Sequence, residues 1–275
     1  MTTVPSVQQH LYEQAYRAAS NDFGMPDRKI IAEESALGKR ILTLGGGDAR
    51  DLWFVAQRAT VINADYAQSG LQQGKSRGVL GVNLDFNLHA TLPFAENSFD
   101  VVVCKDILEH VLSPLEILQE AARILKPDGK IIISVPNHFY FPMRLRLLLG
   151  RGILWRTTLC EHASRFHEWD YMHVRFFTYR GFREFLAAGG LLAEKFYWDF
   201  GTLAHYHDPE RWFEPQLHKR KRGEALSARS RFALAVLRPG WRLFNLLFPR
   251  KLRTWMVSLA PGLLCAGFYA RCRKA

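Results

Sequence analysis

Short apolar runs that alternate with helical segments constrain the fold of this chain more than any other feature. Five runs bounded by turn-forming residues have the character of buried strands, and they lie at 41–44, 60–64, 79–84, 100–104 and 130–135. Strands that alternate with helices form right-handed βαβ units, so the strands pair in parallel and helices cover both faces of the sheet. We therefore predict the α/β fold class, with a doubly wound and mostly parallel sheet.

The clearest predicted helix spans residues 113–125. Ser113 and Glu116 have the spacing of a capping box, and Pro114 suits the first helical turn. The sequence PDG at 127–129 predicts a turn into the fifth strand. Further along we expect a helix at 178–188 and two strand-like segments, LLAEKFYWDF and LLCAGFYARCRK, although a helix competes for the second of these.

Three glycines follow the first strand directly. They belong to the run GGGDA at 45–49, which precedes a predicted helical run, ARDLWFVAQRA. Glycines at such a junction let the backbone approach a ligand closely and leave helix N-terminal N–H groups available. A dinucleotide fingerprint needs Gly or Ala where the chain has Arg50, so the pattern disfavours a nicotinamide cofactor. A purely structural glycine turn is the alternative.

Acidic side chains follow the second and third strands. Asp65 closes the second strand, where a carboxylate can accept hydrogen bonds from both hydroxyls of a ribose; its alternative role is to cap the next helix. Asp85 and Phe86 end the third strand in the segment LDFN, and they offer an acceptor and an apolar wall for a base. Parallel strands present these ends at one edge of the sheet, so we expect one pocket there.

The ordered set LGGGDA, INAD, LDFN, LPFAENSFDVV, ILEHV and RILKPDGKIIISVPN resembles the class I S-adenosylmethionine-dependent methyltransferases. The resemblance covers about residues 40–199. The segments LDFN, SFDVVV, ISVPN, RLRLLLGR and HVRFFTYRGFREFL are most similar to the branch that contains the methionine-biosynthesis W-type and ubiquinone-biosynthesis-type enzymes, methyltransferase types 11 and 23. The resemblance implies a Rossmann-like sheet of seven strands, methyltransferase activity, S-adenosyl-L-methionine as cofactor and S-adenosyl-L-homocysteine as product.

The resemblance also assigns the cofactor site. Its residues would be, in chain order, Gly45, Gly46, Gly47, Asp48, Asp65, Tyr66, Asp85, Phe86 and Lys105. The glycines would cradle the methionine moiety, Asp65 would bind the ribose, and the LDFN pair would bind the adenine. The chain departs from the family pattern at Thr43, where an acidic residue is usual, and at Ala49, where the third motif glycine is usual. Asp48 is a candidate to replace the missing carboxylate.

Methyl transfer from a sulfonium needs chiefly alignment, and a general base is needed only when the acceptor is a hydroxyl or an ammonium. His173, in the segment HVRFFT, is our first candidate for contact with the acceptor, and His110, in LEHV, is the second. His138 is a further histidine candidate, with Asp106 and Glu109 as carboxylate alternatives. For each histidine the alternative is a structural role, satisfied by packing or by backbone hydrogen bonds.

A histidine-rich stretch at 161–173 invites a metal interpretation. Its candidate ligands are His162, His167, Glu168, Asp170 and His173. Neither H-E-x-x-H nor a Cys/His finger spacing is present, so we predict no metal. The stretch is expected to line a polar acceptor pocket.

Three regions are expected from these patterns and from the length of 275 residues. Residues 1–36 would form an N-terminal helical cap. Residues 37–205 would form the cofactor-binding methyltransferase core, with an acceptor loop at about 137–178. Residues 206–275 would form a basic, partly helical appendage that ends in a last strand.

The net charge of +11 lies entirely in the last quarter of the chain. Residues 1–205 hold 22 basic and 22 acidic side chains, whereas residues 206–275 hold 15 basic and 4 acidic ones. In 206–258 the basic residues are mixed with Trp, Phe and Leu, which suits an amphipathic helix on an anionic membrane surface. The alternatives are a helix packed on the core and, less favoured, a nucleic-acid surface at the KRKR cluster.

The cellular compartment is suggested by the cysteines and the first residues. The four cysteines form no C-x-x-C pair, and the start of the chain lacks the layout of a signal peptide. The longest charge-free stretch, at 254–270, is broken by Pro261 and Gly262. We therefore expect a cytoplasmic protein with reduced thiols, with membrane association through 206–258 left open.

The leading functional hypothesis is O-methylation of a small-molecule, glycan or lipid-linked acceptor, with N- or C-methylation as related hypotheses. Because Thr43 removes a carboxylate and no base is assured, a catalytically silent cofactor-binding protein that acts through a protein partner is the alternative.

Overall fold

The computed structural model describes residues 27–35, 37–89, 91–150, 173–198, 217, 220–223 and 225–275. The chain divides into two compact units. Unit 1 comprises residues 1–197 together with 266–275, and unit 2 comprises residues 198–265. The C-terminal strand therefore belongs to the unit that also holds the N-terminal two thirds of the chain.

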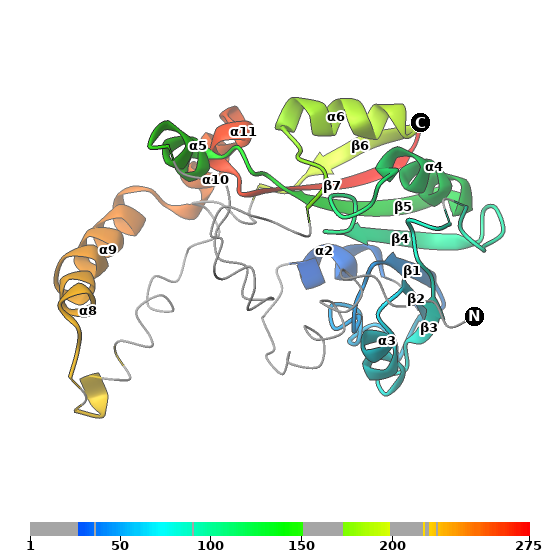
Figure 1. Ribbon diagram of the computed structural model, residues 1–275, viewed down its shortest axis with the longest axis horizontal. Helices are drawn as coiled ribbons and strands as arrows, with labels where there is room; N and C mark the ends of the chain where they lie inside the picture. The colour runs from blue at the N-terminus through cyan, green and yellow to red at the C-terminus, as the bar shows by residue number, and fades with distance from the viewer. Residues whose placement is uncertain are drawn as a thin grey trace. The chain divides into compact units, whose positions relative to one another are not determined.

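Unit 1 is built on a sheet of seven strands in the order β3-β2-β1-β4-β5-β7-β6 (Figure 1). The strands are β1 Arg40–Leu44, β2 Thr60–Asp65, β3 Leu80–Asn83, β4 Phe99–Lys105, β5 Leu125–Pro136, β6 Leu191–Phe196 and β7 Gly267–Lys274. Strands β1 to β5 pair in parallel, and β7 runs antiparallel between β5 and β6. The predicted α/β fold, a mostly parallel Rossmann-like sheet of seven strands, is confirmed.

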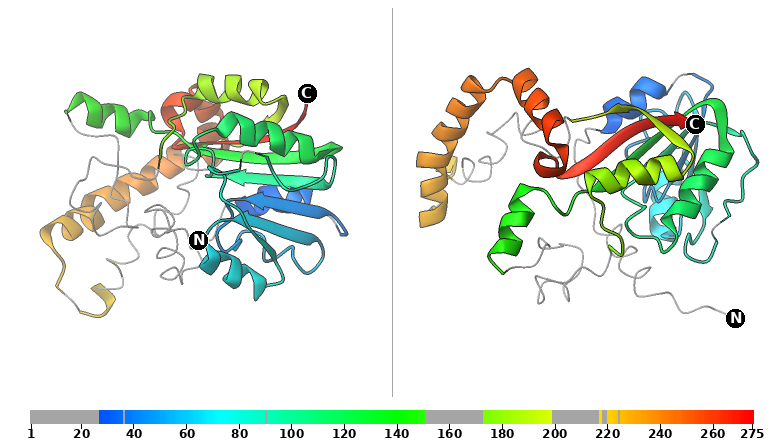
Figure 2. Two further views of the ribbon diagram at one scale, coloured as in Figure 1. Left: turned by 45° about the vertical axis from the view of Figure 1, so that its right-hand side comes forward. Right: turned by 90° about the horizontal axis from the view of Figure 1, so that it is seen from above.

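Helices cover both faces of this sheet. They are α2 Asp27–Glu34, α3 Gln68–Lys75, α4 Pro114–Ile124 and α6 Tyr179–Ala188, and a further helix, α5 Phe141–Leu148, follows β5. Helices α4 and α6 lie side by side on one face and α2 lies on the other (Figure 2). The buried positions of α4 are Ile117, Leu118, Ala121 and Ile124, whereas Leu115, which the helical spacing predicts on the same face as Leu118, is 37% exposed. Gly189 allows this packing, because a Cβ there would lie 2.5 Å from the Leu118 side chain.

Two local predictions about helix α4 and strand β5 are corrected. Ser113 is the residue before the helix, as expected, but its side chain makes no capping hydrogen bond. Strand β5 already begins at Leu125, which pairs with Phe99, so the PDG sequence lies within the strand and not ahead of it. The register shift between Phe99 and Val101 absorbs the extra residues.

The predicted helical run at 49–59 forms successive turns instead of a helix. Its amides donate to carbonyls three and four residues back, as in Leu52 to Ala49 and Ala56 to Leu52. The Trp53 indole N–H donates at 2.9 Å to the Asp48 carbonyl, which a helix beginning here would offer to the Leu52 amide. Ala49 also has a left-handed φ of 53°, which is incompatible with a helix start.

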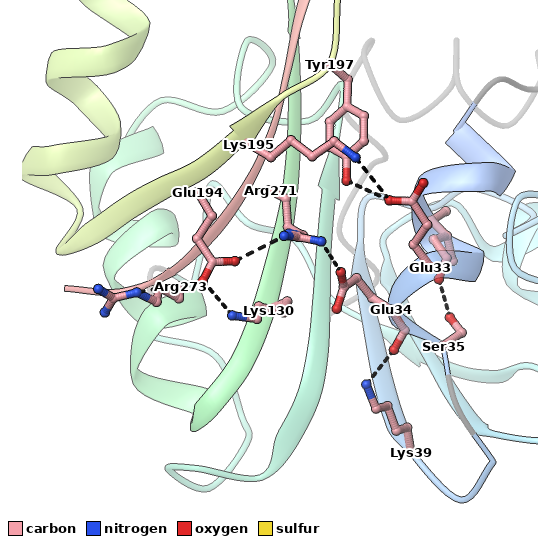
Figure 3. Close-up of polar contacts among 11 residues, drawn as sticks. Glu33, Glu34, Ser35, Lys39, Lys130, Glu194, Lys195, Tyr197, Arg271 and Arg273 are labelled. Atoms are coloured by element: carbon pink, nitrogen blue, oxygen red, sulfur yellow. Dashed lines mark hydrogen bonds and ion pairs between the residues drawn. The ribbon is translucent and has the colours of Figure 1, made fainter.

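Ionic contacts join α2 to the antiparallel edge of the sheet (Figure 3). The Arg271 guanidinium on β7 donates to Glu34 of α2 at 2.6 Å, and its Nε lies 3.3 Å from Glu194 of β6. Beside it, the Tyr197 hydroxyl donates to Glu33 at 3.2 Å. Burial and the Glu33 carboxylate raise the pKa of Tyr197 to about 12, so this hydroxyl keeps its proton at neutral pH.

Replacing Arg271 with alanine should lower the free energy of unfolding by about 1 to 2 kcal/mol, because Glu34 then loses a charge-assisted hydrogen bond at a site only 12% exposed. Urea denaturation followed by circular dichroism measures the change. Arg180→Ala is the control, because the Arg180–Glu184 pair is exposed, and it should leave the urea midpoint unchanged. Equal midpoints for the two variants would contradict a stabilising role for the Arg271 contacts.

Unit 2 is helical where it is described between 228 and 264. Its elements are α8 Ala228–Phe232, the π-helix η2 Ala233–Leu237, α9 Arg238–Leu247, α10 Arg250–Leu259 and α11 Pro261–Leu264. Among the helices that the structure describes in either unit, none combines the length and the apolar character that a membrane crossing requires.

Candidate functional site

The glycine turn after β1 is shaped by the packing of the protein itself. Gly45 and Gly47 have φ angles of 66° and 57°, in the left-handed region that favours glycine. A Cβ on Gly45 would lie 2.5 Å from the Ile107 side chain, and one on Gly46 would lie 2.6 Å from the Asn63 side chain. The turn therefore packs directly against the loop that follows β4.

Two polar side chains at the end of β2 hold the turn in place. Asn63 accepts a hydrogen bond from the Gly46 amide at 3.2 Å and donates to the Gly47 carbonyl at 2.8 Å. Asp65 accepts from the Gly47 amide at 2.7 Å with one carboxylate oxygen and from the Ala67 amide at 2.8 Å with the other. Both side chains are buried. Residues two apart on a strand face the same side, which is why these two reach the same turn.

Asn63 was missed by the sequence analysis, although a signal was present. It is a polar residue inside an otherwise apolar run, and it stands two positions before Asp65. A buried amide in a strand needs a specific partner, and the glycine turn supplies one.

Replacing Asn63 with alanine should lower the free energy of unfolding by about 2 kcal/mol, because a buried amide and a buried carbonyl of the turn lose their partner. Chemical denaturation gives this value. Asn83→Ala is the matched control, since that amide donates to the Tyr66 carbonyl at an exposed position and its loss should have a smaller effect. A wild-type midpoint for the Asn63 variant would show that its side chain does not stabilise the turn.

The predicted adenosine-binding residues lie together at neighbouring strand ends. The Leu84 amide donates to the Asp65 carbonyl at 3.0 Å, which brings the LDFN segment beside the end of β2. Phe86 is buried, and Asp85 is half-buried with one carboxylate oxygen bonded to the Asn87 amide at 2.9 Å. Tyr66, directly after Asp65, is half-buried. Two carboxylates and one apolar ring provide hydrogen-bond acceptors and an apolar surface, which suit the hydroxyl donors of a ribose and the ring of an adenine.

Asp48 and Lys105 are engaged within the protein. The Asp48 carboxylate is buried and accepts from the Arg50 guanidinium at 2.6 to 3.0 Å. The suggestion that Asp48 replaces the carboxylate missing at Thr43 is therefore not favoured by this geometry. Lys105 pairs with Asp51 at 2.6 Å, which links the end of β4 to the segment after β1.

Three histidines gather around Glu109 beyond the ends of β4 and β5. Glu109 is only 1% exposed, and its Oε1 lies 3.6 Å from His110 Nε2 and 3.9 Å from His173 Nε2. On the other side of His173, its Nδ1 lies 2.9 Å from Nε2 of His138. The two histidines ranked highest from the sequence therefore meet in space, with ring centroids 4.6 Å apart.

Backbone contacts fix this cluster beside the glycine turn. The Glu109 carbonyl accepts from the amides of Val174 and Arg175 at 2.8 and 3.1 Å, so the segment that carries His173 is held against the loop after β4. That loop also contains Ile107, the residue that packs against Gly45. The histidine cluster and the glycine turn therefore share one edge of the sheet, outside the carboxyl ends of its parallel strands.

Glu109, His110 and His173 also have a spacing that suits a divalent cation, since one ligand atom from each lies within 4.8 Å of the others. The prediction of no metal stays a prediction. The remaining ligand candidates of the histidine-rich stretch, His162, His167, Glu168 and Asp170, lie outside the described residues. Only the two ends of the predicted acceptor loop, 137–150 and 173–178, are described.

Comparison with known proteins finds a methyltransferase domain in part of the chain. A family model described as a methyltransferase domain matches residues 42–133, about a third of the chain, and these residues contain the glycine turn, Asp65 and the Glu109 loop. This part of the chain is similar to the class I S-adenosylmethionine-dependent methyltransferases. This confirms the resemblance noted in the sequence, and the family implies S-adenosyl-L-methionine as the cofactor of the methyltransferase domain.

Several curated relatives are named as methyltransferases of ubiquinone biosynthesis or of demethylmenaquinone. The ubiquinone biosynthesis O-methyltransferase of Hahella chejuensis is 34% identical over 114 residues, which are 39% of this chain and 48% of that protein. The demethylmenaquinone methyltransferase of Paenarthrobacter aurescens is 28% identical over 143 residues, which are 50% of this chain and 51% of that protein. The chain thus spans about half the length of the curated relatives that it matches.

Solved structures share the fold over almost the whole chain. A TehB-like S-adenosylmethionine-dependent methyltransferase from Corynebacterium glutamicum is 14% identical with a TM-score of 0.52, covering 97% of this chain and 98% of that one. The [4+2]-cyclase SpnF is 16% identical with a TM-score of 0.54, covering 99% and 96%. At these identities the likeness concerns the fold alone.

Proposed function

We propose that this protein transfers a methyl group from S-adenosyl-L-methionine to a hydroxyl group of a small-molecule acceptor. The observation that carries the proposal is the cluster of His110, His138 and His173 around the buried Glu109, beside the glycine turn. A hydroxyl acceptor must lose a proton as it takes the methyl group, and a histidine is the side chain best suited to accept it near neutral pH.

Three sets of residues would bind the three parts of the cofactor. Asp65 would accept hydrogen bonds from the ribose hydroxyls, and Asp85 with Phe86 would bind the adenine. The turn at Gly45 to Gly47 would hold the methionine moiety. When bound, S-adenosyl-L-methionine supplies an electrophilic methyl group for in-line displacement.

The histidine cluster would hold and move the proton. His173 would take the proton from the acceptor hydroxyl, and the neighbouring Glu109 carboxylate would stabilise the positive charge that the ring gains. Nε2 of His138 lies 2.9 Å from Nδ1 of His173, whereas Nε2 of His173 faces Glu109. His138 would therefore fix the orientation of the His173 ring. In this scheme His138 is a positioning residue, and His110 is a second neighbour of the same carboxylate.

The acceptor class follows from two considerations. One of the relatives named above is a ubiquinone biosynthesis O-methyltransferase, which supports transfer to an oxygen atom of a small molecule. Glycan and lipid-linked hydroxyl acceptors remain within the proposal, because only the ends of the acceptor loop are described. An anionic membrane surface is a further proposed partner of the basic C-terminal region, and it is argued separately below.

The test has two stages. Calorimetric titration with S-adenosyl-L-methionine, S-adenosyl-L-homocysteine and NADH should show binding of the first two only. Transfer of a labelled methyl group is then measured with a panel of catechols, hydroquinones, sugars, lipid-linked sugars and primary amines. Transfer to hydroxyl compounds supports the proposal, whereas transfer to amines alone would replace it with N-methylation.

Two control results distinguish the alternatives. Binding without transfer to any member of the panel would favour the catalytically silent protein that acts through a partner. Loss of transfer after treatment with EDTA, with recovery on adding Mg²⁺ or Zn²⁺, would show that the Glu109 cluster acts as a set of metal ligands and not as a proton acceptor.

A further inference from the structure

The helices of unit 2 that the structure describes between 228 and 264 contain Arg and Lys but no Asp or Glu. From residue 225 to residue 275 the sequence contains ten Lys or Arg residues and no Asp or Glu. Seven of the ten lie between 228 and 259, in the helices α8 to α10. Surface helices of soluble domains normally mix both signs, so a purely cationic set indicates an anionic neighbour.

Helix α10 carries an exposed apolar stripe on the same segment. Leu252, Trp255, Met256 and Leu259 stand at i, i+3, i+4 and i+7, which is one face of a helix, and they are between 37% and 65% exposed. The opposite side of the helix carries Arg253 and Val257, which are buried. The stripe is therefore not the side that the fold of the protein covers.

Helix α9 repeats this arrangement. Leu243, Leu246 and Leu247 lie on one face and are between 55% and 78% exposed. Phe244 points to another side, where its ring stacks on Phe248 and lies 5.9 Å from the Arg253 guanidinium of α10. The two helices thus contact each other through the phenylalanines and Arg253, and each leaves a leucine-rich stripe exposed.

We propose that α9 and α10 bind the surface of an anionic membrane, with the two apolar stripes inserted at the boundary between headgroups and acyl chains. Helix α10 is about 15 Å long, half the thickness of the hydrocarbon core, and α9 continues from α8 and η2 in a stretch that contains four arginines. None of the described helices has both the length and the apolar character of a membrane crossing, so we place α9 and α10 in the interface. Trp255 is the side chain type enriched at that depth, and the Lys and Arg residues meet the phosphates.

Charge decides between a membrane and another copy of this chain. A second copy would bring a second cationic surface against the first, with no acidic residue of 225–275 to compensate it. An anionic bilayer satisfies both features at once, because it offers negative charge at its surface and apolar volume just below. This inference goes beyond the proposed methyl transfer and does not depend on it.

The test is co-sedimentation of the full chain with vesicles of phosphatidylcholine alone and of phosphatidylcholine with 30 to 40% phosphatidylglycerol, about the anionic content that makes such binding measurable. We expect binding to the anionic vesicles that weakens in high salt and little binding to the neutral ones. The double variant Trp255→Glu and Leu259→Glu should reduce the partition coefficient at least about tenfold. Arg231→Glu with Lys251→Glu reverses two charges that would face the lipid phosphates and should also reduce it at least about tenfold.

Leu115→Glu is the matched control, since Leu115 is an apolar side chain on the exposed side of α4 in unit 1, and it should bind like the wild type. Circular dichroism and S-adenosyl-L-methionine binding establish that each variant folds. If both double variants sediment like the wild type, or if the wild type ignores anionic vesicles, the proposal is wrong. If the apolar variant instead abolishes a dimer seen by light scattering while vesicles have no effect, the stripes serve self-association and the membrane assignment is overturned.

Discussion

Replacing Asp65 with alanine is expected to weaken the binding of S-adenosyl-L-methionine by about 100-fold. The change removes a buried carboxylate that we assign to the ribose hydroxyls, and a hydrogen bond to a charged group contributes about 1.5 to 3 kcal/mol. It also removes the acceptor of the Gly47 and Ala67 amides, so the glycine turn loses part of its support. Isothermal titration calorimetry measures the dissociation constant directly.

Two further variants separate the direct effect of Asp65 from its effect on the turn. Asp65→Asn keeps one oxygen as an acceptor and should retain more affinity than the alanine variant. Asn63→Ala disturbs the same turn and leaves the carboxylate in place, so it should reduce stability more than affinity. If the alanine variant binds the cofactor as tightly as the wild type, the assignment of Asp65 to the ribose is wrong.

The parallel sheet was accessible from the sequence because its determinants are local. Each strand of the parallel part is a short run of mainly apolar residues, and βαβ units have one handedness, so the alternation of elements predicts this sheet. The prediction that all five runs are buried is wrong for β3, which lies at the edge of the sheet and is largely exposed. The expected helix at 49–59 is replaced by turns that begin at Ala49, whose φ of 53° is left-handed, and helix periodicity does not reveal such a backbone conformation.

The part of the candidate site formed by the glycine turn and Asp65 could be predicted, because its residues belong to short sequence motifs. The glycine turn and Asp65 lie at consecutive strand ends, and their spacing along the chain marks them. The histidine cluster is different, because His110, His138 and His173 come from three segments separated by 28 and 35 residues. Each could be named as a candidate, but only the packing of the 174–175 backbone on the Glu109 carbonyl brings them together.

The fold alone leaves the reaction open. A [4+2]-cyclase shares it over almost the whole chain, so the sheet topology is compatible with chemistry other than methyl transfer. The proposal of methyl transfer rests instead on two features at the same edge of the sheet, the proposed cofactor residues and the histidine cluster proposed to accept a proton. The consequence is that variants of this cluster test the function more directly than variants of the core.

Replacing His173 with glutamine is expected to lower kcat for methyl transfer by about 10² to 10³, the range in which a general base contributes. Glutamine keeps a hydrogen-bonding group of similar size but cannot take up the proton. The affinity for S-adenosyl-L-methionine should stay within about twofold of the wild type, because Asp65 and the glycine turn are untouched. Single-turnover transfer to the hydroxyl acceptor selected by the panel measures the rate.

His138→Asn distinguishes positioning from direct proton transfer. Its Nε2 lies 2.9 Å from Nδ1 of His173, the ring nitrogen on the side away from Glu109, so the variant should lower kcat less and move the pH profile of the reaction. A purely structural histidine would lower stability and leave that profile in place. If His173→Gln turns over the hydroxyl acceptor at the wild-type rate, the cluster does not carry the proton, and the base must be sought among Asp106 and the residues of the acceptor loop.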